Sequence, residues 1–218
     1  MPFPMTHLYI AQKIAESFPR LAADYPQFFL GTLAPDAVHF REGFTGDDKK
    51  KSHLVVGDEK WGQVTNDTEW IDSVLSFLQA RKKSENRDFV YGYVIHILAD
   101  VYNNIHVWSP FLEKHPAEWG KTGYESLYHT ESARIDLKLS QDFAHKAEVW
   151  KWLEESSCFD FEGLVSAEEM KRGAENILYK QYSNLPVIDT SAHTLFTYEK
   201  AVAFIDGAAQ FVMETLAL

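Results

Sequence analysis

The residues whose types and spacing allow chemistry are histidines and acidic residues in the first two-thirds of the chain. His96 and Asp100 are four residues apart in an otherwise apolar segment, so on a helix they lie on the same face. An unpaired charge buried there is costly. His96 and Asp100 are therefore either hydrogen-bonded to each other or bound to a metal ion. Imidazole and carboxylate without thiolate suit Zn²⁺, with Fe, Mn or Ni as alternatives in mixed oxygen and nitrogen sites.

His106 follows Asp100 by six residues. On a straight helix its side chain points about 120° away from that of Asp100, because each residue turns the helix by about 100°. A bend at Asn103-Asn104, both weak helix formers, would bring it back. From the spacing alone, His106 is as compatible with a structural role as with a ligand role.

Other candidate ligands are dispersed in short motifs. His7 opens the first predicted helix, Asp36 follows an apolar run that ends in a proline, and His53 lies farther along in a polar stretch. Each also has a structural interpretation, since a histidine beside apolar neighbours is usually a core residue and an aspartate after a proline often caps a turn. His39, three residues after Asp36, is a candidate for an extra ligand or for a hydrogen bond to one.

A second group of candidates lies between residues 125 and 136. Glu125 precedes His129 by four residues, a helical spacing that places both on one face, and Glu131 follows it by two. Either glutamate is therefore a candidate carboxylate to accompany His129 at a metal ion. Asp136, one turn farther along, is a candidate for a hydrogen bond to a ligand.

Helices must position these side chains, because strand signals are weak throughout. The segment around His96 is apolar on nearly all sides, which is typical of a central buried helix. Thr6 is a candidate N-cap for the first helix, and Ser166 with Glu169 fits a capping box. From periodicity and stop signals, helices are predicted at 6–18, 68–82, 88–102, 123–139, 142–155, 166–182 and 194–216.

The segment 31–66 differs from the rest of the chain. It is rich in glycine and carries the charge run of residues 47–51, which we interpret as a solvated loop whose lysines could contact a phosphate. The segment is predicted to be a long irregular loop, and loops of this length in compact domains are usually functional or disordered. The presence of Asp36 and His53 in it favours a functional loop.

Composition limits the class of protein. With 218 residues and an apolar fraction of 45%, the chain can form one domain over 1–218. Its net charge of -11 repels nucleic acid and anionic lipid unless bound cations change the local field, so no stable nucleic acid complex is expected. The single cysteine excludes an internal disulfide framework. No signal peptide or membrane span is recognised, which predicts a cytoplasmic protein that meets its substrate from solution.

In order and spacing these motifs resemble the zinc-dependent phospholipase C family, and more distantly the related S1/P1 nuclease and 3'-nucleotidase family. His96, Asp100 and His106 match the family's His-x3-Asp-x5-His pattern, and the segments around His7 and His53 match its shorter motifs. The segment from residue 30 to 36 is similar to that of shorter relatives. The resemblance covers residues 5 to 106 and implies an all-α, multi-helix bundle with a long irregular metal-binding loop.

The resemblance also implies how two or three zinc ions would be held. One ion would be bound by Asp36, His53, His96 and Asp100. A second would use His7 with Asp100 as a bridge, and a third would use His106, His129 and a nearby carboxylate, Glu131 or Glu125.

The sequence departs from the family pattern at three places. The secreted enzymes use a processed N-terminal tryptophan as a ligand, whereas this chain begins Met-Pro-Phe-Pro. Their His-x3-Glu motif ends here at Ala133, and the Gln-Pro before their last core histidine is Asn103-Asn104. These differences fall on the second and third metal sites.

The implied activity is that of a metal-dependent phosphoric ester hydrolase, a phosphodiesterase or phospholipase C, acting on phospholipid head groups or a small phosphodiester. A metal-activated water would attack phosphorus, and Asp36 would orient or deprotonate that water. Two alternatives stay open: a nuclease or nucleotidase of the related family, and a non-catalytic helical protein stabilised by a metal ion. The sequence does not fix the oligomeric state.

Overall fold

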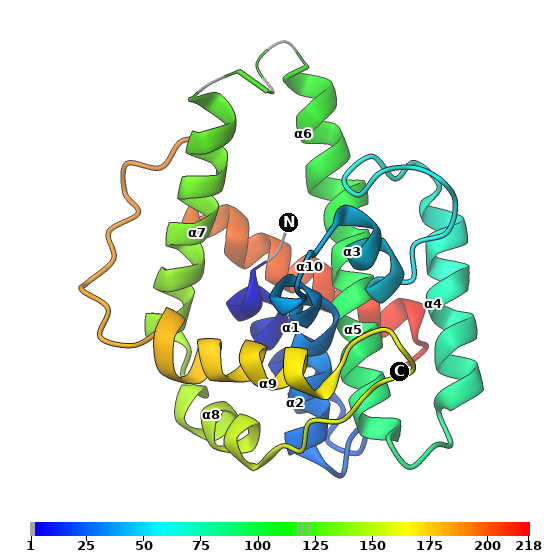
Figure 1. The fold of residues 1–218 in the computed structure, drawn as a ribbon. Helices are drawn as coiled ribbons and strands as arrows, with labels where there is room; N and C mark the ends of the chain where they lie inside the picture. Colours follow the sequence, from blue (N-terminus) through cyan, green and yellow to red (C-terminus); the bar gives the residue numbers. More distant parts are fainter. Residues whose placement is uncertain (1–2, 117, 119, 122) are drawn as a thin grey trace.

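The computed structural model describes residues 3–116, 118, 120–121 and 123–218. These residues form no β-strand, apart from one isolated antiparallel bridge between Phe161 and Val165. The predicted all-α fold is confirmed (Figure 1). The α-helices are α1 (Pro4–Ser17), α2 (Tyr25–Leu33), α3 (Gly46–Ser52), α4 (Asp67–Arg81), α5 (Arg87–Asn103), α6 (Ser109–Lys114), α7 (Tyr124–Asp142), α8 (Lys146–Glu155), α9 (Ala167–Asn176) and α10 (Tyr198–Thr215). The shorter turns are the 3₁₀ helix η1 (Ala34–Phe40) and the π-helices η2 (Asn104–Trp108) and η3 (Ile177–Gln181).

Helix α5 is the centre of the fold, as its apolar composition predicts. Helices α1, α2, α4 and α10 all pack against it, and in Figure 1 it runs between them. Buried apolar side chains from Met5 to Val212 form one contiguous cluster around it. Since α5 carries both His96 and Asp100, the helix that organises the core also fixes two of the candidate ligands.

Helices α2 and α5 approach so closely that their backbones touch. Gly31 and Gly92 lie at this crossing, and a Cβ atom added to either would fall about 2 Å from a backbone carbonyl oxygen of the other helix: 2.1 Å from that of Phe89 and 2.0 Å from that of Phe28. Only glycine allows such an approach. The crossing brings the end of α2 and the start of η1 beside the His96 face of α5.

The prediction of an irregular loop over 31–66 is wrong in part, because α2, η1 and α3 occupy much of it. Asp24 caps α2 by accepting from the backbone N–H of Gln27. Thr45 and Asp48 form a reciprocal capping box at the start of α3. These caps supply the hydrogen bonds that start short helices in a glycine-rich stretch. Residues 53–66 do lack helix, as expected.

Two predicted caps have different outcomes. Thr6 does not cap α1, because the helix begins at Pro4 and Thr6 lies buried within its first turn. A proline at the first helical position starts the helix without a side-chain cap. The capping box of Ser166 and Glu169 is confirmed at the start of α9.

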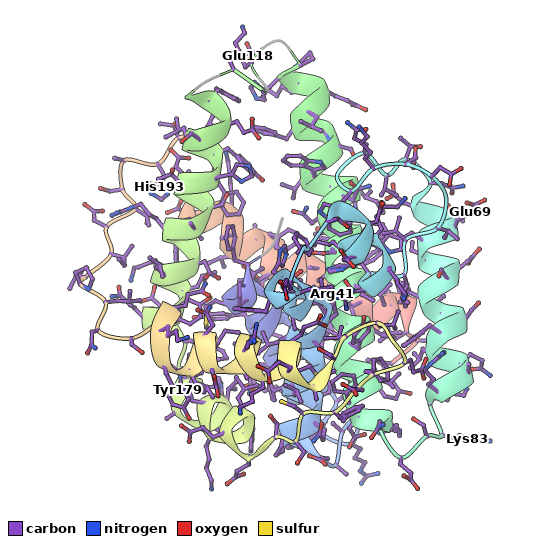
Figure 2. The ribbon with its side chains drawn as sticks, viewed as in Figure 1. Arg41, Glu69, Lys83, Glu118, Tyr179 and His193 are labelled. Carbon is purple, nitrogen blue, oxygen red and sulfur yellow. The ribbon has the colours of Figure 1, made fainter. Side chains whose placement is uncertain are left out.

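Arg41 fastens the η1–α3 segment to α9 (Figure 2). Its guanidinium binds both carboxylate oxygens of Glu169, at 2.6 and 3.1 Å, and Asp48 at 2.7 Å. A further hydrogen bond reaches the Leu164 carbonyl. Bidentate pairs of this kind fix orientation as well as distance, so the segment that carries Asp36 is held between α5 and α9.

No described helix has both the length and the apolar content that crossing a membrane requires.

Candidate metal centre

Five candidate ligands meet at the centre of the fold, and we call them the cluster: His7, Asp36, His53, His96 and Asp100. They come from α1, from η1, from the residue after α3 and, one turn apart, from α5. Four of them are buried, with at most 4% of the residue exposed, whereas Asp36 is 23% exposed. The structure thus brings together side chains that are up to 93 positions apart in sequence.

Donor atoms around Nε2 of His53 and Nε2 of His96 have separations close to those of a zinc site. Nε2 of His53 lies 3.3 Å from Oδ1 of Asp36, 3.2 Å from Oδ2 of Asp100 and 3.2 Å from Nε2 of His96. Nε2 of His96 lies 3.9 Å from each of the same two carboxylate oxygens. Ligands about 2.1 Å from a tetrahedral zinc ion are roughly 3.4 Å from one another. The donor set and its spacing therefore fit zinc.

Backbone carbonyls set the orientation of both histidines. The Nδ1–H of His96 donates to the Thr32 carbonyl at 2.7 Å, and the Nδ1–H of His53 donates to the Lys49 carbonyl at 2.9 Å. A carbonyl oxygen only accepts, so Nδ1 carries the proton and each Nε2 presents its lone pair to the cluster. Sequence reasoning missed Thr32, because a backbone carbonyl leaves no signal in the residue types.

A second ion is suggested by polar atoms that have no partner. Both ring nitrogens of His7 and Oδ1 of Asp100 are buried without a hydrogen bond, although Nε2 of His7 lies 3.7 Å from that oxygen. The His7 ring stacks on His96 with centroids 3.6 Å apart. Buried polar atoms left unsatisfied are rare and costly. His7 and Asp100 are the residues that would hold a cation there, and such an ion would satisfy these atoms.

The two carboxylates of the cluster are ionised at neutral pH. Burial alone would raise the pKa of Asp36, but the Lys49 ammonium with His53 and His96 outweighs it and holds that pKa well below its ordinary value. Burial would also raise the pKa of Asp100, and its contact with His53 and the positive field of the nearby histidines lower it instead. Ionised carboxylates are the form that binds a cation.

Two further side chains lie at the mouth of the cluster. The Lys49 ammonium is 2.7 Å from Oδ1 of Asp36 and 3.3 Å from Nε2 of His39. His39 is 43% exposed, and its Nε2 lies 3.7 Å from Asp36. The position of His39 agrees with a residue that hydrogen-bonds around the cluster. Lys49 belongs to the charge run that was interpreted as solvated loop, yet only 4% of it is exposed.

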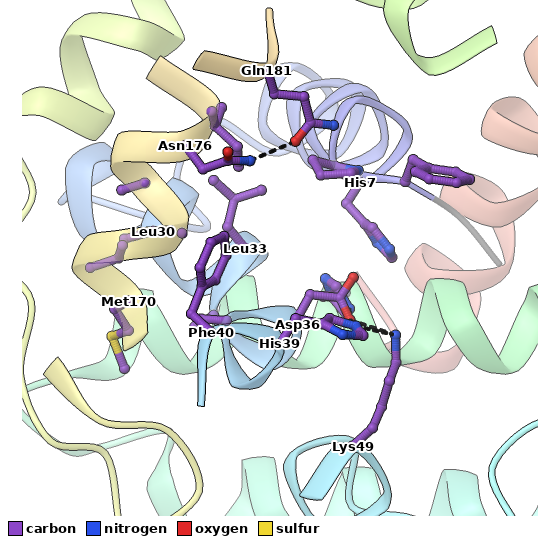
Figure 3. A pocket seen from close by; sticks show the side chains of 18 of the residues that line it. His7, Leu30, Leu33, Asp36, His39, Phe40, Lys49, Met170, Asn176 and Gln181 are labelled. Atoms are coloured by element: carbon purple, nitrogen blue, oxygen red, sulfur yellow. Dashed lines mark hydrogen bonds and ion pairs between the residues drawn. The ribbon is translucent and has the colours of Figure 1, made fainter. Parts of the chain in front are cut away.

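A cavity of about 370 Å³ opens on the cluster (Figure 3). His7, Asp36, His39 and Lys49 line one side of it, and Figure 3 shows apolar side chains gathered on the opposite side. The apolar wall includes Leu30, Leu33, Phe40 and Met170. A smaller hollow of about 230 Å³ reaches Asp100 from another direction, and we call it the indole hollow because Trp61, Trp70 and Trp108 line it.

The remaining sequence candidates are not brought into the cluster. In the part of the chain that the structure describes, close groups of three potential ligands involve only the five cluster residues. His106 is exposed, lies on η2 beyond the end of α5 and packs on Tyr102. The Glu131 carboxylate instead accepts three backbone N–H bonds, from residues 194–196.

His129 and Glu125 lie at the edge of this region. They are 55% and 46% exposed, with 3.9 Å between Nε2 of His129 and Oε1 of Glu125. His129 lines both the large cavity and the indole hollow. The pair thus faces the space in front of the cluster, and the third metal site implied by the resemblance stays a prediction.

Asp136 forms its hydrogen bonds with the backbone at the start of α1 and with η3 and the residue after it, and not with a candidate ligand. Its carboxylate is buried and accepts from the Met5 backbone N–H at 2.9 Å, from Tyr182 and from Gln181. Met5 lies two residues before His7, so this bond sets the position of the helix turn that carries the histidine. Burial raises the pKa of Asp136 to about 7, although its hydrogen bonds act in the opposite direction.

We expect Asp136→Asn to change how stability depends on pH. An Asp with a pKa of about 7 in the folded state and about 3.9 when unfolded binds more protons folded than unfolded between these values. Its contribution is therefore fully present below about pH 4 and is lost as pH rises to about 7. The free energy of unfolding of the wild type should fall relative to the variant by a few kcal/mol across this window. Urea unfolding followed by circular dichroism at stepped pH measures it.

Asp142→Asn, on the same helix, is the matched control. Burial would raise the pKa of Asp142, but hydrogen bonds from Lys138 and Tyr198 lower it, so this carboxyl adds no loss of stability above pH 4. The histidines of the cluster titrate in all three proteins and cancel in the differences. Parallel pH curves for the wild type and Asp136→Asn would show that the carboxyl is ionised in the fold.

The sequence matches the model of a family described as zinc-dependent phospholipase C over residues 6–158. The match contains all five residues of the cluster and extends from α1 to the residues after α8, whereas α9 and α10 lie beyond it. No curated protein and no solved structure matches the chain.

Proposed function

Because the chain belongs to the zinc-dependent phospholipase C family, we propose that it is a phosphodiesterase that uses two zinc ions at the cluster. The observation that supports this most strongly is the grouping of zinc-type donors with orphaned atoms on His7 and Asp100, where His7, Asp36 and His96 line a cavity. A purely structural zinc site has four ligands and no open position. Here the donors face a space large enough for a ligand.

The residues at the site have different roles in the proposed hydrolysis. Zinc, when bound, supplies a water of lowered pKa and positive charge for the phosphate. Asp36 is the most exposed member of the cluster and lines the cavity, so it is placed to orient the attacking water and accept its proton. Asp100 and the three histidines hold the ions in fixed positions. The apolar wall of the cavity keeps bulk water from the reacting groups.

The cavity favours a substrate with an apolar part. Side chains from α2 and η1 form part of the apolar wall, and α9 and η3 contribute Met170 and Ile177. A phosphodiester of a lipid alcohol would place its charged phosphate at the cluster and its hydrocarbon against this wall. Met170 and Ile177 lie beyond the residues matched by the family model, so this part of the wall would set a preference of this chain for the apolar part of its substrate.

Metal analysis with a substrate panel tests the proposal. We expect two zinc ions per chain and turnover of p-nitrophenyl phosphorylcholine and of short-chain phospholipid, abolished by a chelator and restored by zinc. His145→Ala provides the control, because that imidazole pairs with Glu16 away from the cluster. A single tightly held ion with no turnover of any phosphodiester would reject the enzyme in favour of a metal-stabilised protein.

The indole hollow supports a second candidate, a nuclease or nucleotidase. Trp108 donates its indole N–H to the Gly62 carbonyl at 2.8 Å, and Trp70 donates to the His53 carbonyl at 2.7 Å. Both rings line the hollow with Asp100. Trp70 is only 2% exposed, so the partly exposed Trp108 is the ring that would stack a nucleobase. A single-stranded oligonucleotide and a 3'-nucleotide belong in the same panel. Faster turnover of these than of lipid would favour this alternative.

A further inference from the structure

Lys49 is a buried cation beside the cluster that the proposed mechanism does not use. Only 4% of the residue is exposed, whereas the neighbouring Lys51 on α3 is exposed. Lysine is almost never fully buried unless it is paired. The position of this ammonium therefore needs a reason that its surface neighbours do not.

The contacts of Lys49 leave its ammonium directed at the reacting region. It donates to Oδ1 of Asp36 at 2.7 Å and lies 3.3 Å from Nε2 of His39, with the Trp61 ring centroid 4.9 Å away. In Figure 3 the side chain reaches up to Asp36 at the edge of the cavity. Oδ1 of Asp36 is also the atom that faces His53 and His96. If Asp36 held a metal ion through this oxygen, the Lys49 ammonium would keep a donor available for another acceptor.

An anion is the partner that suits such a donor. An ammonium has three donors and no acceptor, and the Lys49 side chain lines the same cavity as His7, Asp36 and His96. A phosphate held at the cluster from that cavity comes within reach of it. The chain as a whole carries a net charge of -11, so a fixed cation at the site also offsets the repulsion that an approaching phosphate meets.

We propose that Lys49 is a phosphate-binding residue, whose ammonium donates to a phosphoryl oxygen of the substrate at the cluster. The proposal rests on the phosphodiesterase function above and adds a substrate contact to it. Lysine acts here as a point charge for phosphate. The competing explanation is that Lys49 only pairs with Asp36 and holds it for the metal, which predicts a different set of results.

The test is phosphate binding by the zinc-loaded protein and by Lys49→Met. Calorimetric titration and thermal unfolding with graded inorganic phosphate measure the Kd, and zinc content is measured on the same samples. We expect Lys49→Met to keep its zinc and to bind phosphate about ten- to hundredfold more weakly, the effect of losing one charge-assisted hydrogen bond. With p-nitrophenyl phosphorylcholine as substrate, KM should rise.

Lys51→Met is the matched control, because it removes the same charge from the same helix at an exposed position. It should bind phosphate within about twofold of the wild type, since screened surface charges contribute little. The control also corrects for the general stabilisation of proteins by phosphate salts. If Lys49→Met does not fold, Lys49→Arg and Lys49→Gln replace it: the arginine variant should keep phosphate binding and the glutamine variant should lose it.

Two results would overturn the proposal. Unchanged phosphate binding by fully zinc-loaded Lys49→Met would show that the lysine does not contact the anion. If Lys49→Met loses both its zinc and its phosphate binding, the lysine acts only by positioning Asp36. If no phosphodiester is hydrolysed but phosphate binding still depends on Lys49, the proposed function fails while the phosphate contact stands.

Discussion

His53→Ala should leave the protein without its tetrahedral zinc ion and lower phosphodiester turnover by about three orders of magnitude or more. Nε2 of His53 is within 3.3 Å of donor atoms on Asp36, His96 and Asp100. Its removal therefore takes away the donor that lies closest to the other three. Without the metal, the pKa of the attacking water returns to its much higher value in bulk water. Zinc content after dialysis and turnover of p-nitrophenyl phosphorylcholine give the two measurements.

Loss of zinc must be separated from loss of folding, because His53 is fully buried and its truncation leaves a void. Thermal unfolding with and without added zinc makes the separation. The wild type should be stabilised by zinc through mass action, by about 4 kcal/mol at a thousandfold excess over Kd, whereas His53→Ala should show little or no zinc-dependent shift. His145→Ala should behave as the wild type does. A variant that retains wild-type zinc content and activity would remove His53 from the metal site.

Gly92→Ala should destabilise the fold by roughly 3 kcal/mol or more. In an ordinary helix this substitution stabilises, by about 0.5–1 kcal/mol. At Gly92 the new Cβ would lie 2.0 Å from the Phe28 carbonyl oxygen and 2.8 Å from the Thr32 backbone nitrogen. Backbone atoms cannot turn away as a side chain can, so α2 and α5 have to separate. Chemical denaturation of the zinc-free protein measures the change in the free energy of unfolding.

The separation of α2 and α5 should also disturb the metal site. Thr32 lies on α2, and its carbonyl accepts the Nδ1–H that orients His96 on α5. We therefore expect weaker zinc binding by whatever fraction of Gly92→Ala folds. Gly173→Ala on α9 is the control, because its new Cβ meets side-chain atoms of Ala37 and Phe40 at an ordinary 3.6 Å. Equal stability of the two variants would contradict the account of the α2–α5 crossing.

The long helices could be predicted from sequence because their patterns are local. The central helix, predicted at 88–102, is found at Arg87–Asn103, since its apolar composition and its flanking breakers lie within the segment. Helices α2 and α3 were missed, because each is short and depends on a cap. The box of Thr45 and Asp48 was a readable signal. The backbone contact at Gly31 and Gly92 was not, because it exists only once two distant segments pack.

The candidate site was predictable where chemistry restricts residue type. Histidines and aspartates in or beside apolar runs stand out, and five of them meet in the structure. Their roles as ligands stay predictions until the metal is measured. Lys49 could not be distinguished from Lys51 by sequence, because burial by η1 and Trp61 separates the two. The sequence pattern proposed His106 as a ligand; it packs on Tyr102 outside the cluster, and its role at a third metal site stays a prediction.

The order of the cluster residues along the chain bears on how the protein acquires its ion. Every cluster side chain is made within the first 100 residues, whereas α10, which packs on α1 and α5, is made last. The nascent chain therefore releases its imidazoles from the ribosome before α10 can pack on α1 and α5. During that interval they are open to any divalent cation in the surroundings. In the folded protein an ion enters or leaves through the cavity, so access through it governs exchange of the metal.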